Sequence, residues 1–210
     1  MAVAKPQLSL RAEHAADTRR RILQAAADVF VEVGYAGARI EDIATRAGVA
    51  VPTVYKVLTN KTNLLIGALN EAMTGARDNT GAIDQQSWFI EQLEEPDVVR
   101  QLQLVARNAR RMYERAGRLL NVLRAAAPLD AELDHVWAGI TSDRLKRSRR
   151  TANNLLQKAG ARARLSRDDT VVTLLALTEP ELFTAFATGR RTADQYETWL
   201  GDVLCRSLLE

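Results

Sequence analysis

Residues 34–61, with the sequence GYAGARIEDIATRAGVAVPTVYKVLTNK, constrain this chain more than any other segment. Their pattern predicts two short helices that are joined by a tight turn at Gly48 and followed by the start of a third helix. A helix–turn–helix of this kind places its second helix in the DNA major groove. The contacts that would hold the first two helices at a steep angle come from small apolar residues: Ile43, Ala44, Ala47, Val49, Val54 and Val57.

The composition favours a helical protein that contains no membrane span. The chain has 210 residues, 47% of them apolar and 26% charged, with only 11 Gly and 5 Pro. It has no run of 18 apolar residues, and its first residues lack the apolar core of a signal peptide. The single cysteine, Cys205, excludes an internal disulfide and fits a reducing compartment. We therefore expect a cytoplasmic protein.

The positive charge is concentrated in the segment that holds the helix–turn–helix. The whole chain carries a formal net charge of +3. Residues 1–66 contain nine Lys and Arg against six acidic residues, whereas the rest of the chain contains 20 of each. Basic side chains in that segment suit a polyanion, because neutralising phosphates releases counterions.

Apolar spacing predicts four helices in the first third of the chain. The first should run from about residue 17 or 18 to Val33, and Gly34 should end it in the left-handed conformation. The next two should cover about 39–47 and 51–58. Asn60 should cap the fourth helix.

The remainder is also expected to be helical. The polar segment 75–86 carries two glycines and suggests that a domain boundary lies near it. We assign residues 1–66 to the first domain and residues 67–210 to the second. Pro128 and Gly160 should each end a helix, and Asp130 should cap one. The expected helices are 88–94, 96–116 with a related segment at 117–127, 130–159, 166–178, 180–187 and 192–209.

Residues 18–69 resemble the TetR family of bacterial transcriptional regulators. The resemblance lies in motifs at fixed spacing over a quarter of the chain: Ile22, Ala26, Phe30, Gly34–Tyr35, Ile43–Ala44, Ala47–Gly48–Val49, Thr53–Val54–Tyr55, Asn60–Lys61 and Leu64–Leu65. It implies an all-α fold with an N-terminal three-helix helix–turn–helix domain. A larger C-terminal helical domain would bind a ligand and form the homodimer.

The resemblance also implies the residues that contact double-stranded operator DNA. Val51 and Pro52 would contact a thymine methyl group, and Thr53 a phosphate or a base edge. Lys56 would reach a guanine or a phosphate. Three further residues are expected to contact phosphates: Arg39, Tyr55 and Lys61.

Two positions depart from the family pattern. Ala38 and Arg39 stand where members usually carry the Thr or Ser that caps the second helix. Lys56, Val57 and Leu58 follow Tyr55 where an aromatic or a His-Phe pair is common. The first departure removes a capping hydroxyl, and the second predicts a different operator preference.

The resemblance further implies a small-molecule effector and a homodimer interface in the C-terminal helices. The dimer would use helices 166–178 and 192–209, through Val171, Val172, Leu174, Leu175, Leu200, Val203, Leu204 and Leu208. The effector site would be lined by apolar and aromatic residues, each of which also suits an ordinary core position: Trp88, Phe89, Met112, Tyr113, Leu120, Leu123, Trp137 and Ile140. Arginine-rich segments at 107–118 and 144–150 fit either an anionic ligand or a solvated helix face.

Three alternatives stay open. An enzyme is disfavoured, because His14 and His135 stand alone and no metal-binding, nucleophilic or phosphate-binding motif is present; we expect no catalytic residues, metal or cofactor. A scaffold that has lost DNA binding is disfavoured by Thr53, Tyr55 and Lys61 together. A regulator without a ligand would be favoured by a filled C-terminal core, and a ligand-responsive one, most often a repressor, by an empty cavity.

Overall fold

The computed structural model of the chain describes residues 10–74, 83–158, 165–189 and 191–209. The elements of these residues are all helices, which confirms the all-α prediction. They form two compact units, Met1–Glu71 and Ala72–Glu210. The boundary after residue 66 stays a prediction, and most of the polar segment 75–86 lies outside the described residues.

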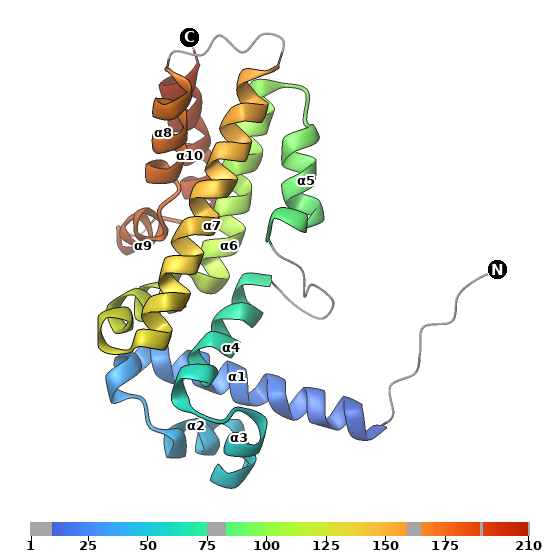
Figure 1. The fold of residues 1–210 in the computed structure, drawn as a ribbon, viewed down its shortest axis with the longest axis vertical. Helices are drawn as coiled ribbons and strands as arrows, with labels where there is room; N and C mark the ends of the chain where they lie inside the picture. Colours follow the sequence, from blue (N-terminus) through green and yellow to red (C-terminus); the bar gives the residue numbers. More distant parts are fainter. Residues whose placement is uncertain (1–9, 75–82, 159–164, 190, 210) are drawn as a thin grey trace, which may run out of the picture. The chain divides into compact units, whose positions relative to one another are not determined.

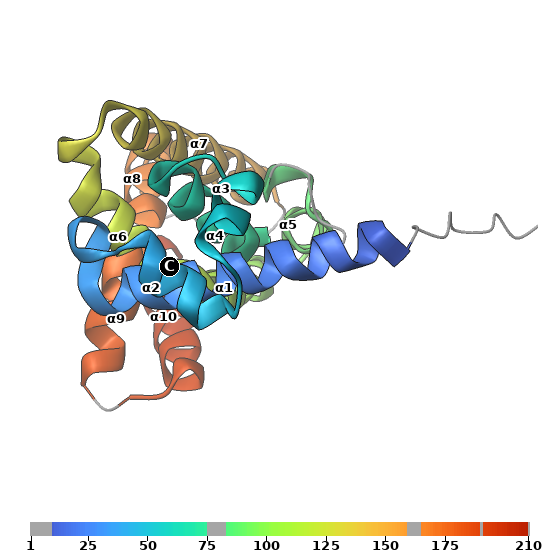
Figure 2. The same cartoon turned by 90° about the horizontal axis from the view of Figure 1, so that it is seen from below.

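The first unit contains helices α1 (Leu10–Gly37), α2 (Ile40–Ala47) and α3 (Val51–Val57), and most of α4 (Lys61–Thr74). Helix α2 packs against α1, and α3 packs against α2; Figure 2 shows α2 and α3 as two short helices. Their shared core consists of apolar side chains that are at most 4% exposed, among them Ile22, Phe30, Ile43, Val54, Leu64 and Leu65.

Helix α1 differs from its predicted form at both ends. It begins at Leu10 rather than near residue 17, because residues 10–16 (LRAEHAA) are good helix formers without a glycine or proline. Gly34 has a positive φ of 73°, as predicted, but its ψ of 173° is extended rather than left-handed. The helical backbone is therefore interrupted at Gly34, and one further turn leads to Gly37.

The turn between α2 and α3 depends on Gly48. This residue is left-handed, with φ 65° and ψ 41°, and its N–H bonds to carbonyls in the last turn of α2. The Arg21 guanidinium, on α1, donates to the carbonyl oxygens of Ala47 at 2.5 Å and Gly48 at 3.3 Å. Arginine therefore satisfies the carbonyl end of α2 and ties it to α1.

Helix α4 begins as predicted. The Asn60 side chain accepts a hydrogen bond from the Asn63 backbone N–H at 2.7 Å, which is the expected N-cap. The predicted inward residues Leu64, Leu65, Ala68 and Leu69 are all buried.

The second unit consists of long antiparallel helices and shorter ones packed against them (Figure 1). The predicted cap of the long helix is present, since Asp130 accepts from the N–H groups of Glu132 and Leu133. Ser166 likewise caps the next helix by accepting from the N–H of Asp169. The elements are η1 (Ile83–Gln85), α5 (Ser87–Glu94), α6 (Val98–Ala126), η2 (Ala127–Leu129), α7 (Ala131–Leu156), α8 (Arg167–Leu177), α9 (Pro180–Thr188) and α10 (Ala193–Leu208).

Helix α6 is continuous, where the sequence suggested two segments meeting at residue 117. Gly117 is buried in its interior, and a Cβ there would lie 3.8 Å from the Phe183 ring. The backbone stays helical through this glycine, which therefore does not end the helix. Helix α7 ends at Leu156, and Gly160 lies outside the described residues.

Charged and aromatic contacts join α6, α9 and α10. Arg110 on α6 bonds to Glu197 of α10 at 2.9 Å and to Glu114 at 2.7 Å. The Phe183 ring of α9 meets the buried Tyr196 ring edge-on, with centroids 5.0 Å apart, a favourable arrangement for aromatic pairs. No single described helix is long and apolar enough to cross a membrane; only the bent pair α8 and α9 meets that test by length and composition.

We expect opposite effects of alanine at two glycines. Gly48→Ala should lower the free energy of unfolding by about 1–2 kcal/mol, because an L-residue is disfavoured in the left-handed region. Gly139→Ala, at an exposed helical site with open space around it, should raise that free energy by about 0.5–1 kcal/mol. Urea denaturation followed by circular dichroism measures both, and equal effects would contradict the role of Gly48.

Candidate DNA-binding surface and effector pocket

Helix α3 divides cleanly into a buried and an exposed face. Val54 is fully buried and holds the helix on the core, as predicted. Tyr55 is 48% exposed, and Pro52 and Lys56 are exposed. Val51 and Thr53 are half-buried at the N-terminal turn. The residues predicted to read DNA therefore lie on one accessible side of a short helix.

Arg39 occupies the N-cap position of α2. Its side chain is exposed and makes no capping hydrogen bond, so the missing capping hydroxyl is not replaced from within α2. The guanidinium has no ion-pair or hydrogen-bond partner among the described residues, which leaves it available to a phosphate.

Lys61 makes contacts that the sequence did not reveal. Its Nζ donates to the carbonyl oxygens of Ala38 at 2.9 Å and Ala36 at 3.3 Å. It also lies 4.7 Å from the centroid of the Tyr35 ring, a cation–π contact. Lys61 thus fastens the start of α4 to the segment between α1 and α2, in addition to any contact with a phosphate.

A partly open pocket lies among α5, α6, α7 and the end of α8. Its cavity volume is about 80 Å³, which exceeds the roughly 10–15 Å³ that one water molecule needs. Asn108 donates to Gln92 at 3.1 Å, and Gln92 donates to Thr151 at 3.3 Å. The lining residues are Ile83, Trp88, Phe89, Gln92, Val105, Asn108, Ala109, Met112, Tyr113, Arg144, Arg147, Ser148, Thr151, Leu174 and Thr178.

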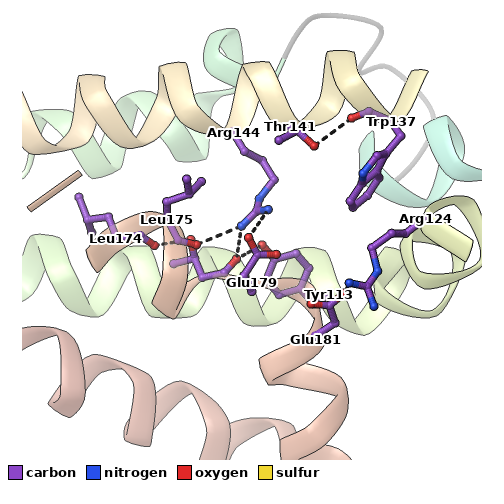
Figure 3. Close-up of polar contacts among 10 residues, drawn as sticks. Tyr113, Arg124, Trp137, Thr141, Arg144, Leu174, Leu175, Glu179 and Glu181 are labelled. Atoms are coloured by element: carbon purple, nitrogen blue, oxygen red, sulfur yellow. Dashed lines mark hydrogen bonds and ion pairs between the residues drawn. The ribbon is translucent and has the colours of Figure 1, made fainter. Parts of the chain in front are cut away.

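A buried arginine forms one end of this pocket (Figure 3). Arg144 is 8% exposed and pairs with Glu179 at 2.8 Å. It also donates to the carbonyl oxygens of Leu175 and Thr178. The Tyr113 hydroxyl donates to the same Thr178 oxygen at 2.5 Å. Burial raises the pKa of Tyr113 to about 12, so the hydroxyl keeps its proton at neutral pH.

Comparison with known proteins identifies the first unit. Residues 22–68 match the family model for the bacterial regulatory proteins of the tetR family. The chain carries a TetR-family DNA-binding domain. The matched residues run from the middle of α1 to α4 and include the whole helix–turn–helix.

Solved structures with the fold of the whole chain include three regulators of bacterial origin. A protein of Saccharomonospora viridis in complex with choline is 19% identical, covers 93% of this chain and 99% of its own, and has a TM-score of 0.71. NalD of Pseudomonas aeruginosa, the secondary repressor of the MexAB-OprM efflux pump, is 22% identical (94% and 98%, TM-score 0.67). FadR of Bacillus subtilis with stearoyl-CoA is 20% identical (90% and 98%, TM-score 0.64). At these identities the likeness shows the fold.

Four of the eight residues predicted to line the effector site of this TetR-type fold do line the pocket: Trp88, Phe89, Met112 and Tyr113. The other four, Leu120, Leu123, Trp137 and Ile140, are not among the residues that line this pocket. Leu120 and Trp137 each lie seven residues, roughly 10 Å along a helix, from lining residues. Helical periodicity identified the correct faces of α6 and α7 but not the depth at which the pocket lies.

The predicted dimer residues fall into two groups, those buried within the chain and those at least partly exposed. Five of the eight, Val171, Leu174, Leu200, Leu204 and Leu208, are buried inside the single chain, with at most 6% exposure. They pack between α8 or α10 and the long helices, so they are core residues and not a free interface. Val172 is 62% exposed, whereas Leu175 and Val203 are half-buried. For these three residues, a place in the dimer interface stays a prediction.

We expect Lys61→Ala to destabilise the first unit by about 1–2 kcal/mol, because it removes charge-assisted hydrogen bonds to two carbonyls. Lys56→Ala, at an exposed lysine without such contacts, should change stability by less than about 0.5 kcal/mol. All three tryptophans lie beyond residue 71. Amide hydrogen exchange in α1 to α4 is therefore the suitable measurement, and similar protection in both variants would contradict a structural role for Lys61.

Proposed function

We propose that this chain is a ligand-responsive transcriptional regulator, most simply a repressor, that binds a palindromic operator as a homodimer and is released by a small molecule. The observation that carries the proposal is the exposed face of α3, within a domain that matches the TetR family. Tyr55 and Lys56 are open to solvent there while Val54 fixes the helix on its core.

The exposed residues support both kinds of DNA contact. Lys56 supplies a cation that can donate to guanine or to a phosphate, and Val51 and Pro52 supply apolar surface for a thymine methyl group. Arg39 and Tyr55 supply donors for phosphates, which fix the position of the helix in the groove. Lys61 would approach a phosphate only together with the carbonyls that it already contacts.

A homodimer is proposed because one helix–turn–helix reads too few base pairs for a genome-wide search. A two-fold dimer reads two half-sites about one helical turn apart. Val172 is a large apolar side chain exposed on α8, and Leu175 and Val203 are half-buried. We place the dimer contact on this surface of α8 and α10.

The presence of a pocket favours a ligand-responsive regulator rather than a regulator that acts without a ligand. A filled core would leave no space for an effector, whereas this pocket is partly open and has a cavity volume of about 80 Å³. An effector that binds one conformation more tightly than another shifts the population toward it. Choline and stearoyl-CoA, found with two structural neighbours, differ in chemistry, so the shared fold does not choose the effector. A DNA partner and one unpaired cysteine fit a cytoplasmic protein.

The operator can be found by selection from a random pool of double-stranded DNA. We expect wild type to enrich a palindrome, and Lys56→Ala to enrich a site changed at the same position of each half, since a base contact contributes about 1–3 kcal/mol of discrimination. Arg149→Ala, which removes an exposed charge from α7, is the control and should return the wild-type site. No enriched sequence would overturn the DNA-binding proposal, and an unchanged site for Lys56→Ala would remove Lys56 as a reader.

The dimer surface is tested by Val172→Glu. A buried, unpaired carboxylate is costly, so sedimentation should show a shift toward monomer and operator affinity should fall at least about tenfold. Val99→Glu, at an exposed valine on α6, is the matched control. A Val172→Glu protein that stays dimeric would place the interface elsewhere.

A further inference from the structure

Helix α7 places two guanidinium groups in the pocket wall, one turn apart. Arg144 is already satisfied by Glu179 and by two backbone carbonyls of the α8–α9 corner. A ligand would have to break several charge-assisted hydrogen bonds to recruit it. Arg144 therefore belongs to the frame of the pocket.

Arg147 is in the opposite situation. It is partly buried, and among the described residues it has neither a hydrogen bond nor an ion pair. Asp143, one turn before it on α7, is bonded to Lys146 at 2.8 Å. Burial lowers the pKa of Arg147 more than the nearby Asp143 and Asp84 raise it. Because arginine stays protonated in proteins, the pocket wall carries a cation that forms no ion pair with any described residue.

The remaining lining completes a recognisable pattern. Among the described residues, no aspartate or glutamate lines the pocket. Thr151, one turn beyond Arg147, accepts a hydrogen bond from Gln92 and keeps its own hydroxyl proton to donate. Large apolar side chains, Trp88 and Met112 among them, cover other parts of the wall. The walls thus combine an unpaired cation, a hydroxyl donor and an apolar surface.

We propose that the effector is an organic anion with an apolar body, such as an aryl or medium-chain carboxylate, whose head group pairs with Arg147. This inference rests on the proposed function, since it names the ligand class of the proposed effector pocket. The planar guanidinium matches a carboxylate or sulfonate through paired N–H donors. A cationic ligand would add a second unpaired positive charge to a partly desolvated site, and a neutral one would leave the guanidinium without its partner.

Two fluorescent probes with the same ring system test the charge of the ligand. 8-Anilino-1-naphthalenesulfonate carries a sulfonate, and N-phenyl-1-naphthylamine lacks it. We expect Arg147→Met to weaken binding of the sulfonate probe by roughly tenfold or more, the effect of losing a charge-assisted hydrogen bond, and to change binding of the neutral probe less than about twofold. Arg149→Met, two residues away on the exposed side of α7, should leave both dissociation constants unchanged.

Further measurements fix the site and the charge dependence. Arg147→Lys keeps the cation but loses the paired N–H donors, so its affinity for the sulfonate probe should lie between those of Arg147→Met and wild type. Decanoate should displace the sulfonate probe from wild type at lower concentration than decan-1-ol does. Equal weakening of both probes by Arg147→Met would overturn the proposal, because Arg147 would then only shape the pocket. So would unchanged sulfonate affinity, equal displacement by acid and alcohol, or no binding of either probe.

These measurements use no DNA, so they separate the two proposals. If the sulfonate preference depends on Arg147 but no DNA sequence is enriched, the anion site stands and the proposed regulator does not. If an operator is found but the protein binds the neutral probe alone, and Arg147→Met does not change that binding, the proposed regulator stands and the anionic effector does not.

Discussion

The arrangement of helices in the second unit depends on the bonds that compensate one buried cation, the Arg144 guanidinium. Removing the Arg144 guanidinium from water costs several kcal/mol unless it is paired and hydrogen-bonded. The carbonyls of Leu175 and Thr178 are left free by the end of α8, where the helix dipole is also negative, and Glu179 follows directly. One side chain of α7 therefore fixes the corner between α8 and α9. Tyr113 of α6 bonds to the same corner, which joins three helices around one end of the pocket.

The fixed corner explains why Arg147 remains available. Glu179 is paired with Arg144, and no carboxylate among the described residues forms an ion pair with the second guanidinium. The same helix thus provides one arginine that builds the wall and another that faces a possible ligand. An anion at Arg147 would replace the missing counter-charge without disturbing the Arg144 contacts, which is how a pocket can be both rigid and selective.

The basic side chains of the helix–turn–helix unit also include some that are bonded within the protein and others that have no partner among the described residues. Arg21 donates to carbonyls at the C-terminal end of α2, and Lys61 donates to that of Ala38, just before α2. Arg46 forms a bidentate pair with Glu32 at 2.7 and 2.8 Å. Arg39 and Lys56 make no such contact among the described residues. The positive excess of residues 1–66 is therefore only partly available to DNA. Some of it holds α2 in place, so that the remaining groups are presented in a fixed arrangement.

Sequence alone located nearly all the helices, because their signals are local. Asn60, Asp130, Ser166 and Thr192 cap helices through hydrogen bonds that span two or three residues, and such bonds can be read from neighbouring letters. Local signals failed at Gly117, which lies inside α6 and does not end a helix, since a helix tolerates a single glycine at a cost of roughly 1 kcal/mol. They also failed to extend α1 to Leu10, since no clear start signal marks that end.

What the sequence determined by itself is the helix–turn–helix, the faces of its helices and the TetR resemblance of residues 18–69. Only the tertiary structure decided which of those faces stays open. It placed five predicted dimer residues in the core and moved the pocket roughly two turns from Leu120 and Trp137. It also separated the paired arginines from the unpaired one. The physical reason is that periodicity fixes the direction of a side chain about its helix, whereas burial and charge pairing depend on partners that are distant in the chain.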